Sequence, residues 1–127
     1  MEFDQYVTDK FPNICVAEGE IHSVGITPSS PEIEGLKQEI AREITSRYTL
    51  ENVKHDPLFR AYRDFFWSVG VDPTKTRPAS EALVRRILSG GRLPAINTAV
   101  DAYNLASARS GVPIGAFDRD TIDGDLT

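Results

Sequence analysis

The stretch ASEALVRRILSGGRLPAINTAVDAYNLASARSG, residues 79–111, decides the fold because it holds two helical patterns on either side of a double glycine. Apolar residues recur at intervals of three and four before the glycines, which predicts a helix over 79–89. Asn97 then provides a good N-cap and Gly111 a stop, which predicts a helix over 97–110. These two helices are the last of four that the sequence predicts.

Two further helices are predicted before this stretch. A Ser-Pro step, in which serine caps and proline starts a helix, precedes apolar residues at helical spacing and predicts a helix over 31–47. An Asp-Pro step at residues 56–57 predicts the next helix, which ends at Gly70. This helix holds Trp67 and several other aromatic residues, and aromatics at such spacing indicate core packing more often than a stacking platform for bases.

The two flanks of the chain carry strand patterns. Residues 13–26 are rich in β-branched side chains with local alternation, which predicts one or two strands broken at Gly19, with Cys15 buried as a small hydrophobe. Residues 114–117 predict another strand. The expected fold is therefore α+β, a small sheet packed against about four helices, in a single domain over residues 1–127.

Composition narrows the class of protein. The chain has 127 residues, 40% of them hydrophobic and 26% charged, which is ordinary for one globular domain. The single cysteine excludes an internal disulfide framework, so a reducing, cytoplasmic location is expected. No apolar run approaches the roughly 20 residues that a membrane helix needs, so no membrane partner is expected. The two histidines lie at no metal-binding spacing and no phosphate loop follows a strand, so neither metal nor cofactor is expected.

The net charge of −5 argues weakly against nucleic acid, but the charge is unevenly distributed. Residues 1–56 hold eleven acids and five bases, whereas residues 75–92 hold five bases and a single acid, Glu81. A local basic segment can bind a polyanion even in an acidic protein. The candidate phosphate contacts are Lys75, Arg77, Arg85, Arg86 and Arg92. The alternative is an ordinary solvated helix face, and Arg85 and Arg86 diverge by about 100° around their helix.

Polar residues form a stripe on the helix predicted over 97–110. Asn97, Asp101 and Asn104 are spaced by four and three, so they lie along one line of the helix surface. Asparagine within a helix is a poor helix former, so Asn104 calls for a hydrogen-bonding reason. Two interpretations stay open: the stripe lines a polar pocket, or Asn97 is only a cap and Asn104 bonds a neighbouring loop.

The second half of the chain resembles a known domain. The run INTAVDAYNLASARSGVPIGAFD, residues 96–118, is similar to the pattern I-N-N-V-V-D, T-N-Y and G-Q-P-L-H-A-F-D of the B3/B4 domain. This is the tRNA-binding and editing module of the β subunit of phenylalanyl-tRNA synthetase. The freestanding B3/B4 proteins share the G-V-x-P-T/S-K stretch, the E-A-L-x-R-R helix and the P-x-G-A-F/Y-D ending. The resemblance covers residues 69–126 densely and the first half only in outline.

This resemblance implies an α+β domain that binds tRNA and hydrolyses mischarged aminoacyl-tRNA. The family's substrate-binding asparagine falls on Asn104, while its editing histidine falls on Gly115, whose backbone alone could approach the ester. The expected substrate-binding residues are thus Asn104, Gly115, Asn97 and Asp101, and no catalytic residue is identified. Freestanding members run further, so the chain resembles an N-terminal half, apparently truncated.

Three readings therefore stay open. The first is a tRNA-binding module with trans-editing activity, and the second is a non-catalytic module that binds an amino acid, another small molecule or RNA. The third is a fragment that is completed by its missing half or by another copy of itself. In that third case the strand at 114–117 leaves an open edge, with an exposed apolar patch near Ile114, Phe117 and Ile122.

Overall fold

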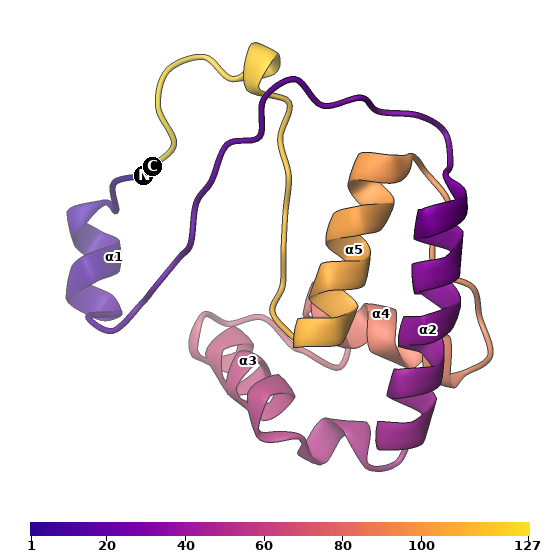
Figure 1. The fold of residues 1–127 in the computed structure, drawn as a ribbon. Coiled ribbons are helices and arrows are strands. Elements are labelled where there is room, and N and C mark those ends of the chain that lie inside the picture. Colours follow the sequence, from indigo (N-terminus) through magenta and orange to yellow (C-terminus); the bar gives the residue numbers. More distant parts are fainter. The chain divides into compact units, whose positions relative to one another are not determined.

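The structure is a computed structural model, and it describes residues 1–127. The chain divides into two compact units, one formed by residues 26–116 and the other by residues 1–25 together with 117–127. All of the longer helices belong to the first unit (Figure 1). They are α2 (Pro31–Arg47), α3 (Pro57–Ser68), α4 (Ala79–Leu88) and α5 (Thr98–Ser110), with a short 3-10 helix, η1 (Val53–His55), before α3.

The helix starts follow from local capping. Ser30 Oγ accepts a hydrogen bond of 3.2 Å from the Ile33 amide at the start of α2, and Asp56 Oδ1 accepts one of 2.9 Å from the Leu58 amide at the start of α3. Asn97 Oδ1 accepts one of 2.9 Å from the Val100 amide at the start of α5. These bonds satisfy amides that have no partner inside the helix. The sequence-based starts and ends of all four helices are confirmed to within two residues.

The core of this unit lies where α2, α4 and α5 pack against one another (Figure 1). Its buried apolar side chains are Ile40, Ile44, Val53, Phe59, Val84, Ile87, Leu93, Leu105 and Ala108. Gly111 ends α5 with φ +76°, and a Cβ at this position would lie 2.7 Å from Cδ2 of Leu58. Glycine therefore permits both the left-handed turn and the close approach of α3.

The α3 helix contributes less to the core than its sequence predicts. Its buried side chain is Phe59, whereas Leu58 and Val69, which share the expected apolar face, are exposed. Trp67 is also exposed, so the expectation that this helix packs its aromatics into a core is wrong for its only tryptophan. Helical spacing identifies an apolar face but does not show how much of it a neighbouring element covers.

The second unit has little regular structure and no buried residue. It contains α1 (Gln5–Lys10), which the sequence did not predict, and the 3-10 helix η2 (Arg119–Thr121). The Met1 ammonium pairs with Glu18, Arg119 Nε pairs with Glu20 at 3.3 Å, and the Glu2 amide donates to the Leu126 carbonyl at 3.3 Å. Cys15 is exposed, which corrects its expected burial.

The predicted α+β class is wrong, because the structure contains helices and no strand. Residues 13–26 and 114–117 have no ladder partner, and Val16, Ile21 and Val24 are exposed. Alternating β-branched residues favour an extended backbone, but a strand also needs a neighbour to accept its hydrogen bonds. Without a strand at 114–117, the argument for an open sheet edge also fails, although Ile114 and Phe117 are exposed.

Candidate nucleic-acid interface

The connector before α4 is a rigid turn that presents two of the predicted cations. Asp72 Oδ1 accepts hydrogen bonds from the Thr74 hydroxyl at 2.6 Å and from the Thr74 amide at 2.9 Å. These bonds, that of the hydroxyl first, lower the pKa of the Asp72 carboxyl below its ordinary value. Pro73 and Pro78 are fully buried, while Lys75 and Arg77 between them are exposed. The connector is thus anchored at its prolines and directs its basic residues to solvent.

Three of the five predicted cations line one hollow of about 430 Å³. Arg77 comes from the connector, and Arg85 and Arg86 come from the last turn of α4. Leu50, Ala82 and Ser89 complete the lining, so no acidic residue lines the hollow. Lys75 and Arg92 are exposed but do not line it. We call this the arginine hollow.

The two arginines of α4 differ in their availability. Arg85 Nε donates to Glu81 at 3.0 Å, and its side chain is 17% exposed. Arg86 is exposed and its guanidinium has no acidic partner. The divergence expected around the helix is thus seen directly: Arg85 is held inside the protein by an ion pair, and Arg86 faces solvent.

The stem of Arg86 is packed against the turn that follows α4. The Gly91 amide donates to the Arg86 carbonyl at 2.9 Å, and a Cβ at Gly91 would lie 3.0 Å from Cγ of Arg86. A side chain at residue 91 would therefore displace the arginine stem or the turn. Gly91 thus lets the chain fold back over Arg86, and this turn restricts the first carbons of the Arg86 side chain.

Glu81 holds α3 and α4 together through a buried ion cluster. Its carboxylate is fully buried and accepts from two nitrogens of Arg63, at 2.7 Å from Nη2 and at 2.9 and 3.1 Å from Nε, in addition to the bond from Arg85. Burial raises the pKa of the Glu81 carboxyl, but the bonds and charges of the two arginines outweigh burial and lower that pKa below its ordinary value. Glu81 therefore stays charged inside the unit.

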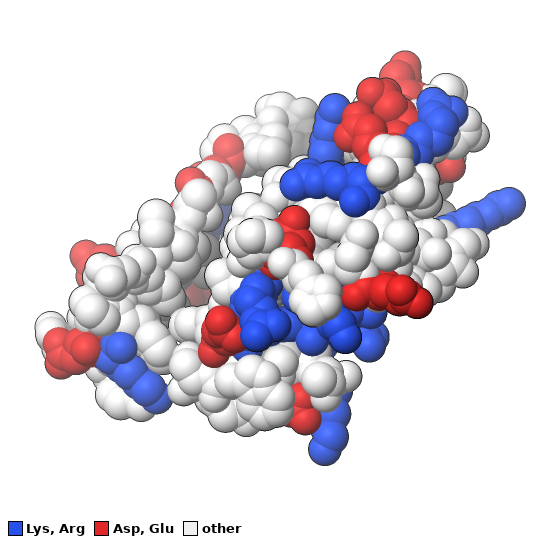
Figure 2. Space-filling model, turned by 90° about the horizontal axis from the view of Figure 1, so that it is seen from below, with Lys and Arg blue, Asp and Glu red and all other residues white.

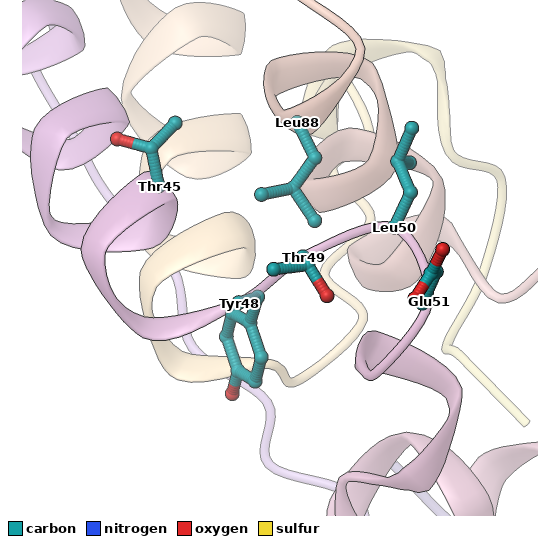
Figure 3. Close-up of a pocket in the computed structure, with 6 residues that line it drawn as sticks. All are labelled: Thr45, Tyr48, Thr49, Leu50, Glu51 and Leu88. Carbon is teal, nitrogen blue, oxygen red and sulfur yellow. The ribbon is translucent and has the colours of Figure 1, made fainter.

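A second hollow, of about 510 Å³, shares Leu50 with the arginine hollow. Thr45 comes from α2, Leu88 from α4, and Tyr48, Thr49, Leu50 and Glu51 from the segment that joins α2 to η1 (Figure 3). The Tyr48 hydroxyl donates to Asp56 Oδ2 at 2.9 Å. Burial and this bond raise the pKa of Tyr48, so its hydroxyl stays neutral. We call this the leucine hollow.

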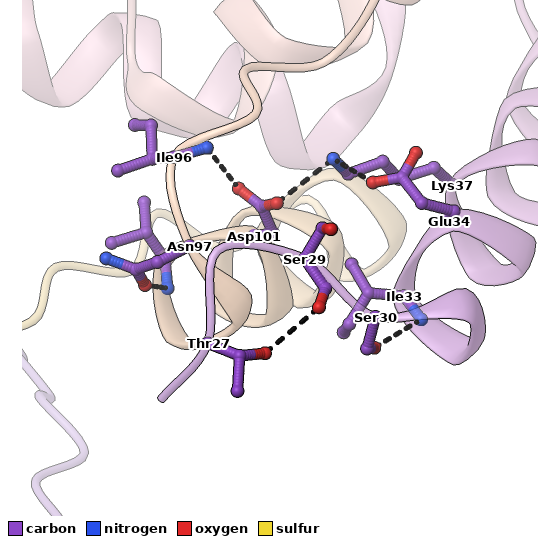
Figure 4. A network of polar contacts seen from close by, with 10 residues as sticks. Thr27, Ser29, Ser30, Ile33, Glu34, Lys37, Ile96, Asn97 and Asp101 are labelled. Carbon is purple, nitrogen blue, oxygen red and sulfur yellow. Dashed lines mark hydrogen bonds and ion pairs between the residues drawn. The ribbon is translucent and has the colours of Figure 1, made fainter. Parts of the chain in front are cut away.

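The polar stripe of α5 divides into two parts. Asp101 is buried, and its carboxylate accepts from the Ile96 amide and from Lys37 Nζ, both at 3.0 Å (Figure 4). Burial lowers the pKa of Lys37, but its bonds to Glu34 and Asp101 outweigh burial and raise that pKa above its ordinary value. Asn97 is the N-cap at the same end of the helix. Asn97 therefore caps α5, while Asp101 holds the turn before α5 and joins this helix to α2.

Asn104 lies apart from that network. It is half-buried, and its side-chain amide makes no hydrogen bond in the structure. No polar contact joins it to Asn97 or Asp101, so a shared pocket stays a prediction. Gly115 is exposed, and a Cβ there would meet nothing within 4 Å. Both residues thus stay candidates for substrate binding that nothing in the structure tests.

Basic and acidic side chains are intermixed on the face of the protein that Figure 2 shows. On the face drawn in Figure 2, Lys and Arg gather in separate groups that are bordered by Asp and Glu. No continuous basic field covers this face. A polyanion would therefore meet local basic sites there rather than a broad positive surface.

Sequence reasoning missed the long-range partners of the two buried carboxylates. The spacing of four between Glu81 and Arg85 could have indicated their helical ion pair, whereas the sequence showed Glu81 only as the one acid of a basic segment. Arg63 lies 18 positions and Lys37 lies 64 positions from its carboxylate partner, and no local pattern connects residues so far apart. The structure also has no helix long and apolar enough to cross a membrane, and no cluster of three metal-binding side chains.

Comparison with known proteins places the second half of the chain in a family. A family model described as B3/4 domain matches residues 61–127, a little more than half of the chain. No curated protein and no solved structure matches. The matched range contains all of α4 and α5, the connector before α4 and the arginines of the arginine hollow. The resemblance to the B3/B4 domain of the phenylalanyl-tRNA synthetase β subunit is thereby confirmed, and the chain belongs to the B3/4 domain family.

Proposed function

We propose that this chain binds tRNA through the arginine hollow. The single observation that supports this proposal most is the convergence of Arg77, Arg85 and Arg86 on one hollow without acidic lining. Arginine forms strong, charge-assisted hydrogen bonds with phosphate oxygens, and phosphate contacts supply most of the non-specific affinity for nucleic acids. Membership of the B3/4 domain family supports the choice of tRNA among the possible polyanions.

Within this proposal the three arginines have different roles. Arg77 and Arg86 are exposed and contact phosphate. Arg85 is paired with Glu81, lines the hollow and contributes no direct phosphate contact. Lys75 and Arg92 are exposed cations outside the hollow and would extend the contact along the RNA. A cytoplasmic location, where tRNA is available, belongs to the same proposal.

The finer proposal is trans-editing, the hydrolysis of mischarged aminoacyl-tRNA. It is supported by the half-buried and unpaired amide of Asn104, which can bind the polar groups of a substrate. The residue at the family's histidine position is Gly115, so only its backbone amide could contact the ester there. Release of the amino acid from mischarged tRNA tests this proposal, and tRNA binding without release would favour the non-catalytic alternative.

The binding proposal is tested by the salt dependence of tRNA affinity. Replacing both free arginines, Arg77→Ala with Arg86→Ala, should weaken tRNA binding. It should also flatten the slope of log affinity against log salt concentration by about the amount that one to two phosphate contacts contribute. Arg42→Ala removes an exposed arginine of α2 that does not line the hollow and is the matched control. An unchanged salt slope in the double variant, or an equal change in the control, would refute the proposal.

A further inference from the structure

The arginine hollow and the leucine hollow adjoin each other. Leu50 lines both, and the consecutive residues Leu88 and Ser89 at the end of α4 line one hollow each. The two hollows therefore meet both at the loop after α2 and at the end of α4. A ligand large enough to occupy both would cross the aliphatic side chains of Leu50 and Leu88.

The polar side chains of the leucine hollow each make a hydrogen bond within the protein, with one exception. The Thr45 hydroxyl donates to the Ala41 carbonyl at 2.9 Å, the Tyr48 hydroxyl donates to Asp56, and the Thr49 hydroxyl accepts from the Asn52 amide at 3.2 Å. Glu51 is exposed and its carboxylate has no partner (Figure 3). It is thus the one polar side chain of this hollow that makes no bond within the protein, and its carboxylate is available to a ligand.

The free groups of the two hollows are opposite in charge. The arginine hollow offers the exposed guanidinium groups of Arg77 and Arg86, and its third cation is already paired with Glu81. The leucine hollow offers the carboxylate of Glu51. A matching ligand carries an anion at one end, a flat or apolar body in the middle and a hydrogen-bond donor at the other end.

We propose that the paired hollows hold one unpaired nucleotide of an RNA strand, with its phosphate in the arginine hollow and its base in the leucine hollow. The base lies against Leu50 and Leu88, and its exocyclic amino group donates to the Glu51 carboxylate. This inference rests on the proposed function and adds a preference to it. Adenine, cytosine and guanine carry such an amino group. Uracil has a carbonyl oxygen at the position of the cytosine amino group and only its ring N3–H as a donor, so a carboxylate placed to accept from the amino group repels it.

The experiment compares single-stranded oligocytidylate and oligouridylate of about twelve nucleotides, which carry equal charge and differ in the group that faces Glu51. The parent protein should bind oligocytidylate on the order of fivefold more tightly in a fluorescence titration. Glu51→Gln should abolish this preference, because an amide can donate to the uracil oxygen as well as accept from cytosine. Glu39→Gln removes an exposed acid of α2 outside both hollows and should leave the preference intact.

A second variant separates the base contact from the phosphate contact. Leu50→Ala should weaken binding of both oligonucleotides on the order of threefold with an unchanged salt slope, since it removes apolar contact but no charge. Equal binding of the two oligonucleotides to the parent, or a preference that survives Glu51→Gln, would overturn this inference. Flattening of the salt slope by the double arginine variant would in that case still support the proposed function, whereas no binding of tRNA or of either oligonucleotide would overturn both.

Discussion

The unit formed by residues 26–116 buries two carboxylates, and they are held in different ways. Glu81 in α4 is enclosed by two arginines, one from α3 and one from its own helix. Asp101 in α5 is shared between one lysine of α2 and the backbone amide of Ile96. Glu81 is held by charged partners alone, whereas Asp101 also accepts a hydrogen bond from a backbone amide. Loss of the negative charge should therefore destabilise the two sites unequally.

The comparison also explains which arginines the protein leaves for a ligand. A buried carboxylate must be paired, because an isolated charge inside a protein is strongly unfavourable. Glu81 meets this requirement by holding Arg63 and Arg85, which removes Arg85 from the set of free surface cations. Arg86, one position further along α4, has no such partner and is free.

The largest effect is expected from Glu81→Gln. This change leaves the guanidinium groups of Arg63 and Arg85 partly buried without a counter-charge, and it should lower the free energy of unfolding by about 3 kcal/mol. Urea denaturation followed by circular dichroism measures the loss. Glu39→Gln, at an exposed position of α2, should change stability by less than about 0.5 kcal/mol. A loss at Glu81 no larger than at Glu39 would contradict the buried cluster.

Asp101→Asn should have a smaller effect, about 1–2 kcal/mol. The asparagine oxygen can still accept from the Ile96 amide, and Lys37 retains its bond of 3.0 Å to Glu34, so only part of the network is lost. The same denaturation experiment compares it with Asp101→Ala, which also leaves the Ile96 amide unsatisfied and should be the more destabilising of the two. Equal losses in both variants would show that the backbone bond contributes little.

The dependence of stability on pH tests the same comparison. The pKa of Glu81 is lowered in the folded protein, so this group contributes its full stabilisation above its ordinary pKa of 4.5. That contribution is lost as the pH falls below 4.5 and through the lower folded value, because the unfolded chain then binds the proton first. Between about pH 5 and pH 3 the parent should therefore lose more stability than Glu81→Gln. Thermal unfolding at a series of pH values measures the difference, and parallel curves would contradict it.

The smallest effect on stability, and the sharpest contrast between neighbours, is expected from Arg85→Met and Arg86→Met. Arg85→Met removes one partner of Glu81 and should destabilise the protein by about 1 kcal/mol, since Arg63 remains. Arg86→Met should change stability by less than about 0.5 kcal/mol and yet weaken tRNA binding more than Arg85→Met does. Thermal unfolding and tRNA titration on the same two variants show whether the roles divide in this way.

The sequence predicts those parts of the fold that depend on neighbouring residues. Ser30, Asp56 and Asn97 act as caps because each side chain accepts from an amide two or three positions along the chain. Neighbouring residues could not decide whether strands form at 13–26 and 114–117, because a strand depends on a partner that can lie anywhere in the chain. Residues 13–26 are rich in β-branched side chains, but the structure gives neither segment a strand partner.

For the candidate site, too, the sequence predicts the features that depend on neighbouring residues and not those that depend on distant ones. The basic character of residues 75–92 is visible in the sequence, and so is the divergence of Arg85 from Arg86. Other features follow from the packing of α2 against α4. This packing brings Arg77 and Arg86 to one hollow and makes Leu50 part of both hollows. Such meetings between distant segments are properties of the tertiary structure, and no spacing rule predicts them.

The pairing of α2 with α5 has a consequence for the order of folding. The bond from Lys37 to Asp101 joins residues 64 positions apart, and that from Arg109 to Glu43 joins residues 66 positions apart. The contact of α4 with α5 closes a much shorter loop, and loop closure becomes less favourable as the loop lengthens. We therefore expect α4 and α5 to associate early and α2 to dock late, so substitutions at the α2–α5 contact should mainly accelerate unfolding and leave the refolding rate almost unchanged.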